Sequence, residues 1–195
     1  MGSVKRGHAR SAPTDTARVH SSMDISVPGG IWSVISLIGS PVAMAIVCAL
    51  VAVMLLRAGN RRAAIACVLI ASLGGLLNTG IKELVHRPRP PGAERYLSGH
   101  SWSFPSGHAM GSLIGYGMLS YCVITYLPAS TAVRRAIVAV CALTVVAVGV
   151  SRIALGVHYR GDVVGGWLIG AVWLASGIAL LRRSESQAAT VTPAR

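Results

Sequence analysis

Two cations near the middle of the chain, Lys82 and Arg89, could bind an anion. They are seven residues apart in the sequence, about two turns of a helix. Pro88 and the two prolines after Arg89 end the helix and leave Arg89 just beyond it. Two positive charges held at a rigid turn favour a negatively charged ligand.

A second helix is predicted to begin at Pro105-Ser106-Gly107-His108. Ser106 is a candidate N-cap, and the free backbone N–H groups and positive dipole end of a helix start form an anion site. Gly107 leaves room for a ligand close to the backbone. His108 would project from the first turn into the same space.

The third cluster contains Arg152, His158 and Asp162. If this turn is helical, the four-residue spacing lets Asp162 bond one imidazole nitrogen of His158 and leaves the other as a nucleophile or base. The planar guanidinium of Arg152 suits phosphate oxygens. Together the clusters provide what phosphoryl transfer needs, which is neutralising charge, a nucleophile and a proton donor for the leaving oxygen. The residues alone leave open which histidine takes which role.

Carboxylates are scarce around these clusters. Only Glu83, Glu94 and Asp162 lie near them in the sequence, with Asp24 farther away. Divalent cations such as magnesium prefer several oxygen ligands, so we expect neither a catalytic metal nor another cofactor.

Five apolar segments must position these residues. A helix of roughly 20 apolar residues crosses a bilayer, and the candidates are residues 31–56, 63–81, 108–127, 136–157 and 163–181. We predict an all-α, polytopic membrane bundle with five transmembrane helices, forming one domain over residues 26–183. A polar, mobile N-terminal tail (1–25) and a polar cytoplasmic C-terminal tail (184–195) would flank it.

Short connections make sequential helices antiparallel, which brings the three clusters to one face of the membrane. The opposite face carries seven arginines, namely Arg57, Arg61, Arg62, Arg134, Arg135, Arg182 and Arg183. The positive-inside rule makes that face cytoplasmic. The active site is therefore predicted on the extracytoplasmic face of the cell membrane.

Composition excludes several classes of protein. With 53% hydrophobic residues and a mean hydropathy of +0.61, the chain is too apolar for a disordered or an ordinary soluble protein. Its net charge of +12 lies in short basic clusters between apolar runs, which disfavours nucleic-acid binding. The four cysteines lie inside apolar runs and are predicted to be free.

Further residues near the clusters have less specific roles. Arg87, Arg95 and Arg160 either attract an anionic headgroup or are simply solvated, and Trp32, Trp102, Tyr96 and Tyr159 fit an interfacial aromatic belt. His86 and His100 are more often structural than functional in such positions. Glycines four residues apart, such as Gly166 and Gly170, are expected to allow close helix packing within the bundle.

The complete pattern resembles the three signature motifs of the type 2 phosphatidic acid phosphatase (PAP2) superfamily. The matching residues are Lys82-x6-Arg89-Pro90, then Pro105-Ser106-Gly107-His108, then Ser151-Arg152-x5-His158-x3-Asp162. The resemblance implies that His158 attacks phosphorus to form a phosphohistidine, with Asp162 orienting it. His108 would protonate the leaving oxygen, and Lys82, Arg89, Ser106, Gly107 and Arg152 would hold the phosphate. Many membrane members have six spanning helices, whereas five are predicted here.

The sequence thus predicts a metal-independent membrane lipid phosphatase. Its small five-helix form favours a polyprenyl diphosphate such as undecaprenyl diphosphate, with phosphatidic acid or phosphatidylglycerophosphate as alternatives. A mechanism with one neutral and one protonated histidine predicts a bell-shaped dependence of rate on pH. The competing classes are a non-enzymatic lipid-phosphate binding or transport protein and a vanadate-dependent haloperoxidase. The oligomeric state stays open.

Overall fold

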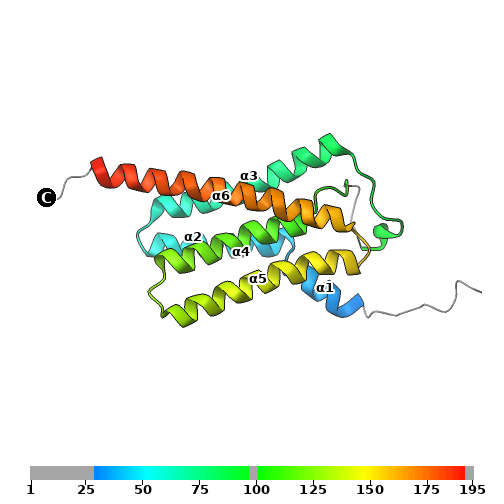
Figure 1. Cartoon of the computed structure of the whole chain (residues 1–195), viewed down its shortest axis with the longest axis horizontal. Helices are drawn as coiled ribbons and strands as arrows, with labels where there is room; N and C mark the ends of the chain where they lie inside the picture. Colours follow the sequence, from blue (N-terminus) through cyan, green and yellow to red (C-terminus); the bar gives the residue numbers. More distant parts are fainter. Residues whose placement is uncertain (1–28, 97–100, 192–195) are drawn as a thin grey trace, which may run out of the picture.

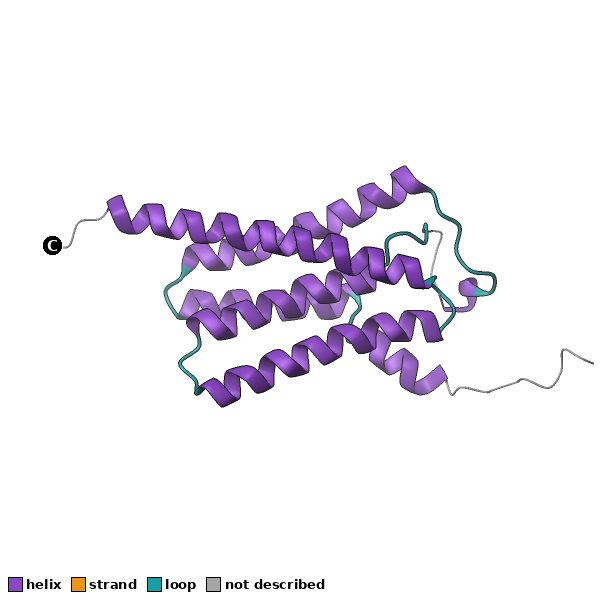
Figure 2. Ribbon diagram, in the orientation of Figure 1, coloured by secondary structure: helices purple, strands orange, loops and turns teal. Residues whose placement is uncertain are grey.

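The computed structural model describes residues 29–96 and 101–191, and within them the regular structure is entirely helical (Figure 2). The elements are α1 (Gly29–Leu37), α2 (Pro41–Arg57), α3 (Arg61–Val85), a short 3-10 helix η2 (Ala93–Tyr96), α4 (Gly107–Tyr126), α5 (Thr131–Ala154) and α6 (Arg160–Val191). The predicted all-α bundle is confirmed. The predicted N-terminal tail and His100 lie outside the described residues.

The first predicted span, residues 31–56, is two helices and not one. α2 begins afresh at Pro41, after Ser40 has turned to an extended conformation and accepts a hydrogen bond from the Ala43 N–H at 3.2 Å. Proline suits the first position of a helix because its missing N–H would have no partner there. The bend also brings Gly39 against Val148 of α5 more closely than any larger residue would permit.

The last helix is longer than the predicted span of residues 163–181. α6 continues through Val191, so that the first residues of the expected C-terminal tail are helical. Glu185 fixes this extension, because its Oε1 accepts hydrogen bonds from Asn60 at 3.1 Å and from Tyr126 at 2.8 Å. Polar contacts between helices thus extend α6 beyond its apolar segment.

α4 is the central helix and packs against α2, α3, α5 and α6 (Figure 1). Four stretches of the described chain are long and apolar enough to cross a membrane: Gly30–Arg57, Arg61–Val85, Thr131–Ala154 and Arg160–Ala188. α4, the remaining predicted span, is 20 residues long and is not one of these four stretches. Because its neighbours surround it, α4 can carry buried polar groups such as Ser112 without exposing them to lipid.

The outer surface of the bundle is apolar. Val42, Leu143 and Val172 are each 69% exposed on three different outer helices. Exposed side chains of this type suit a hydrocarbon environment and would be costly in water. The outside of the molecule therefore fits a lipid bilayer, whereas α4 provides the protein interior.

Glycines allow α4 and α6 to cross closely. A Cβ atom at Gly166 would lie 2.8 Å from the backbone oxygen of Ser106, and one at Gly170 would lie 3.3 Å from that of Met110. The expectation that these glycines serve packing within the bundle is confirmed. Their close approach also places the start of α6 directly beside the start of α4.

α1 and α2 run in the same direction, and from α2 onward the helices alternate, so the connections between them gather at two ends (Figure 1). The α3–α4 and α5–α6 connections and the start of α1 lie at one end. The α2–α3 and α4–α5 connections and the end of α6 lie at the other. We call these the motif end and the arginine end, since the three sequence clusters lie at the first and the seven arginines named above at the second.

Candidate active site

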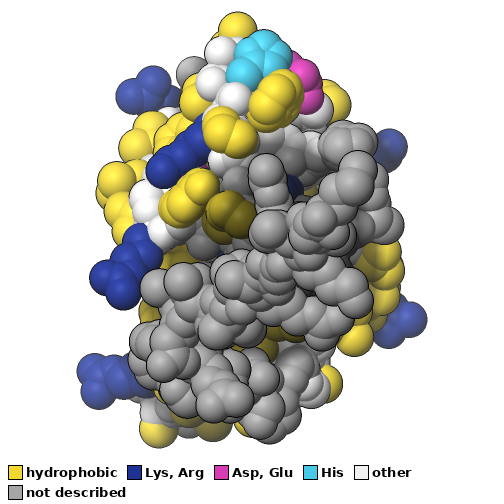
Figure 3. Space-filling model, turned by 90° about the vertical axis from the view of Figure 1, so that its right-hand side faces the viewer, with side chains coloured by type: hydrophobic (Ala, Val, Ile, Leu, Met, Phe, Trp, Pro, Cys, Tyr) yellow, Lys and Arg dark blue, Asp and Glu magenta, His cyan; other side chains and the backbone are white. Residues whose placement is uncertain are grey.

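Four helix termini at the motif end carry predicted site residues. Lys82 comes from the last turn of α3, His108 from the first turn of α4, Arg152 from the last turn of α5 and Asp162 from the first turn of α6. Figure 3 views this end directly and shows Lys and Arg side chains around it, with apolar side chains between them. The structure therefore brings together clusters that are far apart in the sequence.

His158 lies in the α5–α6 connection and is only 4% exposed. Its Nδ1 is 3.4 Å from Asp162 Oδ2, and its Nε2 is 3.2 Å from Arg89 Nη1. A guanidinium can only donate hydrogen bonds, so this contact requires a lone pair on Nε2 and places the ring proton on Nδ1. There it lies between Ser103 Oγ, at 3.5 Å, and the Asp162 carboxylate. Nε2 is consequently the atom available to attack an electrophile.

The environment of His158 keeps its imidazole neutral. Burial lowers the pKa of His158 well below its ordinary value, and the charges of Arg89, Lys82 and Arg152 lower it further against the opposing effect of Asp162. Burial also lowers the pKa of Arg89, although a guanidinium stays charged near neutral pH. At pH 7 the site thus combines a neutral nitrogen base with a fixed positive charge beside it.

Asp162 is completely buried and has more partners than its motif predicts. Arg87 Nη1 donates to Oδ1 at 2.9 Å, whereas Ser103 Oγ donates to Oδ2 at 2.5 Å and the Tyr159 N–H donates to Oδ2 at 2.9 Å. These bonds fix the direction of the carboxylate toward His158.

Sequence analysis did not predict that Arg87 and Ser103 contact Asp162. Arg87 was expected to attract a headgroup or to be solvated, but it pairs with Asp162 and stacks on the Tyr159 ring, with Cζ 4.5 Å from the ring centroid. Ser103 lies two residues before Pro105 and carried no signal of its own. Only the fold shows that both side chains reach a carboxylate on α6.

The three predicted phosphate-binding cations are held in defined positions. Arg89 donates through Nη1 to the Val157 carbonyl at 2.9 Å, and Lys82 Nζ donates to the Trp102 carbonyl at 2.6 Å. Arg152 is 5% exposed and donates to the Ser36 hydroxyl of α1, while its Nε is buried without a partner among the described residues. These cations are preorganised around His158 and retain N–H groups for an anion.

The start of α4 is placed beside these cations. Ser106 caps the helix by accepting from the Ala109 N–H at 3.4 Å, and its own N–H donates to the Asp162 carbonyl at 2.9 Å. A Cβ atom at Gly107 would lie 3.2 Å from Asn78 Oδ1, so a larger residue would crowd this position. His108 is partly buried and lies within electrostatic range of Arg152, Arg89 and Lys82. The predicted anion site thus lies beside His158.

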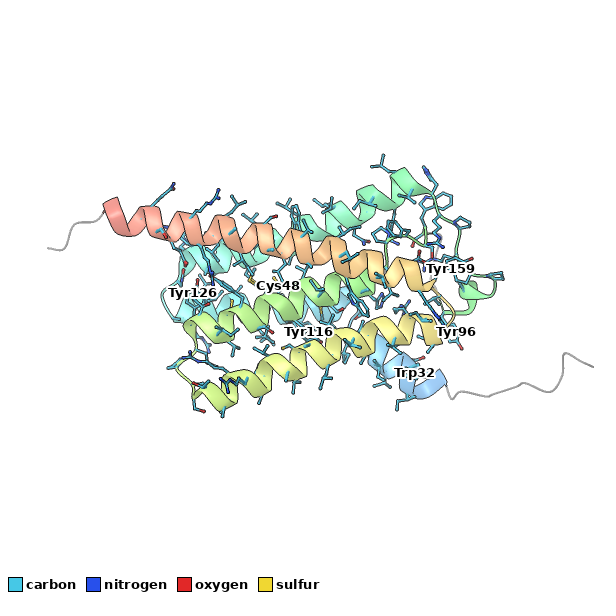
Figure 4. All side chains as sticks on the ribbon, in the orientation of Figure 1. Trp32, Cys48, Tyr96, Tyr116, Tyr126 and Tyr159 are labelled. Carbon is cyan, nitrogen blue, oxygen red and sulfur yellow. The ribbon has the colours of Figure 1, made fainter. Side chains whose placement is uncertain are left out.

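Aromatic residues surround the motif end. Figure 4 shows Trp32, Tyr96 and Tyr159 at this end of the bundle. Trp102 donates from its indole nitrogen to Glu83 at 3.3 Å and meets His86 edge-on, with ring centroids 4.7 Å apart. This arrangement fits the predicted interfacial belt, and it assigns His86 a structural contact.

The donor groups of the site suit an anion. Nowhere in residues 29–96 and 101–191 do three or more His, Cys, Asp or Glu side chains gather as ligands for a metal ion. The carboxylate of Asp162 is already occupied by Arg87, Ser103 and the backbone of Tyr159. What the site offers instead is guanidinium, ammonium and imidazole nitrogen, which match phosphate oxygens.

Known proteins share sequence with this chain. The sequence profile of the PAP2 superfamily matches residues 62–185. Phosphatidylglycerophosphatase B of Bacillus subtilis (strain 168) is 35% identical over 103 residues, which are 53% of this chain and 50% of the relative. The chain thus spans about half the length of this curated relative.

A solved structure shares the fold. It is the crystal structure of the first transmembrane PAP2 type phosphatidylglycerolphosphate phosphatase from Bacillus subtilis, which aligns with a TM-score of 0.73 at 24% sequence identity. The alignment covers 80% of this chain and 77% of that chain. Together with the apolar helices, this likeness makes the chain a multi-pass membrane protein.

Proposed function

Because the chain belongs to the PAP2 superfamily, we propose that it is a membrane-embedded phosphatase that releases phosphate from a lipid phosphate. The observation that carries the proposal is the contact geometry of His158. Its Nε2 faces Arg89 and its Nδ1 faces Asp162, at 3.2 and 3.4 Å. A protein that only binds phosphate needs cations, but it does not need an oriented nucleophile.

The mechanism we propose has two steps. In the first, Nε2 of His158 attacks phosphorus, a nitrogen–phosphorus bond forms, and the bond from phosphorus to the lipid oxygen breaks. His108 donates its proton to that oxygen. In the second step, His108 removes a proton from water, the resulting oxygen attacks phosphorus, and inorganic phosphate leaves His158.

The cations would act on the phosphoryl group in both steps. Lys82, Arg89 and Arg152 would neutralise the equatorial oxygens, together with the N–H groups at the start of α4 near Ser106 and Gly107. Asp162 would stabilise the positive charge that develops on the His158 ring as the nitrogen–phosphorus bond forms. The reaction so described requires no metal ion.

Two lipid classes are candidates for the substrate. The name of the Bacillus relative points to phosphatidylglycerophosphate, which is a phosphate monoester. The small bundle points instead to a polyprenyl diphosphate such as undecaprenyl diphosphate. We place phosphatidylglycerophosphate first, because the relative aligns over 103 residues whereas bundle size is a coarse indicator.

A substrate panel tests the function. The purified protein, in detergent with EDTA, should release inorganic phosphate from at least one of phosphatidylglycerophosphate, undecaprenyl diphosphate and phosphatidic acid. Release from phosphatidylglycerophosphate at the highest kcat/KM supports the proposed preference, and the highest value for undecaprenyl diphosphate would reverse it. Folded protein that binds these lipids and releases no phosphate would contradict the proposed activity.

We further propose that the active site faces the outside of the cell membrane. The arginine end would then be cytoplasmic, as the positive-inside rule requires. In a cysteine-free background, Tyr96→Cys should react with an impermeant thiol reagent added to intact cells, whereas Arg183→Cys should react only after lysis. Both positions are exposed in the structure, so the reverse labelling pattern would overturn the orientation.

A further inference from the structure

At the arginine end, α3 and α6 enclose a groove on the outer surface of the bundle. Its volume is about 530 Å³, and apolar side chains of both helices line most of it. They include Ile65, Leu69 and Leu73 of α3 and Trp173, Leu180 and Leu181 of α6. The groove is separate from the candidate active site, which lies at the opposite ends of these two helices.

Helix contacts close the floor of this groove. Gly177 of α6 touches Ile70 of α3 so closely that a Cβ atom there would lie 2.6 Å from the Ile70 side chain. The Trp173 indole donates to the Ile70 carbonyl at 2.8 Å, which fixes the inner end of the groove. The walls remain open to the surroundings, with Leu69 51% and Leu180 66% exposed.

The length of the groove matches one leaflet of a membrane. Eleven residues separate Arg62 at its mouth from Leu73 at its inner end, which is about 16 Å along a helix at 1.5 Å per residue. The hydrocarbon core of a bilayer is roughly 30 Å thick, so one leaflet contributes roughly half of that. A single acyl chain lying along α3 would therefore fill the groove from end to end.

The mouth of the groove carries unpaired positive charge. Arg62 lines both the groove and an adjacent cavity of about 630 Å³, which Arg61 also lines. Both arginines are exposed, and neither has an ion pair within the part of the chain that the structure describes. Glu185 borders the same cavity, but Asn60 and Tyr126 already donate hydrogen bonds to its carboxylate.

We propose that this groove is a binding site for one anionic phospholipid of the leaflet opposite the active site. One acyl chain lies between α3 and α6, and the headgroup phosphate lies in the adjacent cavity against Arg61 and Arg62. Basic pockets between transmembrane helices bind anionic headgroups in this way. A second copy of the chain fits less well, because pairing would bring two sets of arginines together. The lipid would be a bound ligand and not a substrate.

Trp173 provides a direct probe, because its indole lines the inner end of the groove. The full chain is placed in phosphatidylcholine nanodiscs with increasing amounts of phosphatidylserine brominated in its acyl chains. Phosphatidylserine is anionic but carries no phosphate monoester for the proposed phosphatase to remove. The Trp173 signal is the difference in fluorescence between the wild-type protein and Trp173→Phe. Quenching should saturate at a lower fraction of brominated phosphatidylserine than of brominated phosphatidylcholine.

The double variant Arg61→Gln/Arg62→Gln should weaken the preference of the groove for phosphatidylserine over phosphatidylcholine by up to about thirtyfold. The matched control is Arg57→Gln/Arg135→Gln, which removes the same charge from the same end at positions that line neither cavity. Its preference should stay within about twofold of wild type. Native mass spectrometry of the wild-type protein and of both double variants provides a second readout, which is the amount of phosphatidylserine that stays bound. This readout does not require the Trp173→Phe variant to fold.

Three results would overturn the proposal. Equal quenching of wild-type Trp173 by both lipids would show that the site does not select anionic lipid. An equal loss of preference in the two double variants would assign it to the general charge of the arginine end. Cross-linked dimers that protect Trp173 from both lipids would show that a second copy fills the groove.

Discussion

Two arginines that contact the candidate site and three of the seven arginines at the arginine end are in opposite situations. At the motif end, Arg152 is 5% exposed and bonded to Ser36, and Arg87 is paired with Asp162 at 2.9 Å. At the arginine end, Arg57, Arg61 and Arg62 are exposed, and the described residues offer them no ion-pair partner. Chemistry needs charges whose positions are fixed before the substrate arrives, whereas orienting a chain in a membrane needs only their number and side.

Asp162→Asn should give the largest contrast between the ends. It keeps the shape of the side chain but removes the charge that orients and stabilises the His158 ring. We expect kcat to fall about 10³- to 10⁴-fold while KM changes by less than about threefold. Steady-state phosphate release measures both values. Glu185→Gln is the matched carboxylate-to-amide control at the arginine end. An equal fall of kcat in this control would show that the effect of Asp162→Asn is not specific to the motif end.

Ser103→Ala and Arg87→Gln should each have the next largest effect. Each variant removes one hydrogen bond to the buried Asp162 carboxylate. We expect this loss to lower kcat about 10- to 100-fold. The loss should appear in kcat, because neither side chain is placed against the lipid. Arg160→Gln removes an exposed arginine beside the same helix start and is the control. Unchanged kcat in both variants would make the two contacts irrelevant to catalysis.

Gly166→Ala should destabilise the protein by about 1–3 kcal/mol, because the added methyl group would push against the Ser106 carbonyl. Gly80→Ala is the control, since a Cβ atom at that position has no neighbour within 4 Å. Thermal unfolding in one detergent compares the two variants with wild type. A Tm for Gly166→Ala equal to that of Gly80→Ala would show that the α4–α6 crossing tolerates separation.

The smallest effect concerns the pKa of His158. Burial and neighbouring cations lower the pKa of His158 below its ordinary value of 6.5, so the ring is neutral at any pH above the lowered value. The fall of kcat/KM in acid that is due to protonation of His158 should therefore lie below pH 6.5. Arg89→Gln removes one of the cations and should raise the pKa by about one unit. NMR titration of labelled histidine measures it without activity. A wild-type pKa at or above 6.5 would contradict the description of the site.

Much of this architecture could be predicted from apolar segment length and polar spacing. The break between α1 and α2 was missed, although Ser40-Pro41 is a helix-start signal inside an apolar run. The extension of α6 depends on Glu185 meeting Asn60, 125 residues away in sequence. Contacts of this kind arise from the tertiary fold and leave no local pattern.

In the candidate site too, some features could be predicted from local sequence and others depend on tertiary contacts. The spacing of the apolar segments predicted that the histidines and the cations lie together, because the helix ends that carry them lie at the same face of the membrane. The partners of Asp162 could not be predicted, since Arg87 and Ser103 precede it by 75 and 59 residues and match no spacing rule. Ser106 was predicted both to cap a helix and to hold phosphate. The structure confirms the cap on α4, and the contact with phosphate stays a prediction.

The central claim is that Nε2 of His158 forms the bond to phosphorus. Its most direct test is rapid acid-free quenching during turnover of a ³²P-labelled lipid phosphate, followed by peptide mass spectrometry. We expect an acid-labile, alkali-stable label on His158 in the wild-type protein and in His108→Ala, which should hydrolyse the intermediate more slowly. His158→Ala should carry no label and release no phosphate. Label on another residue, or phosphate release by His158→Ala, would contradict the account.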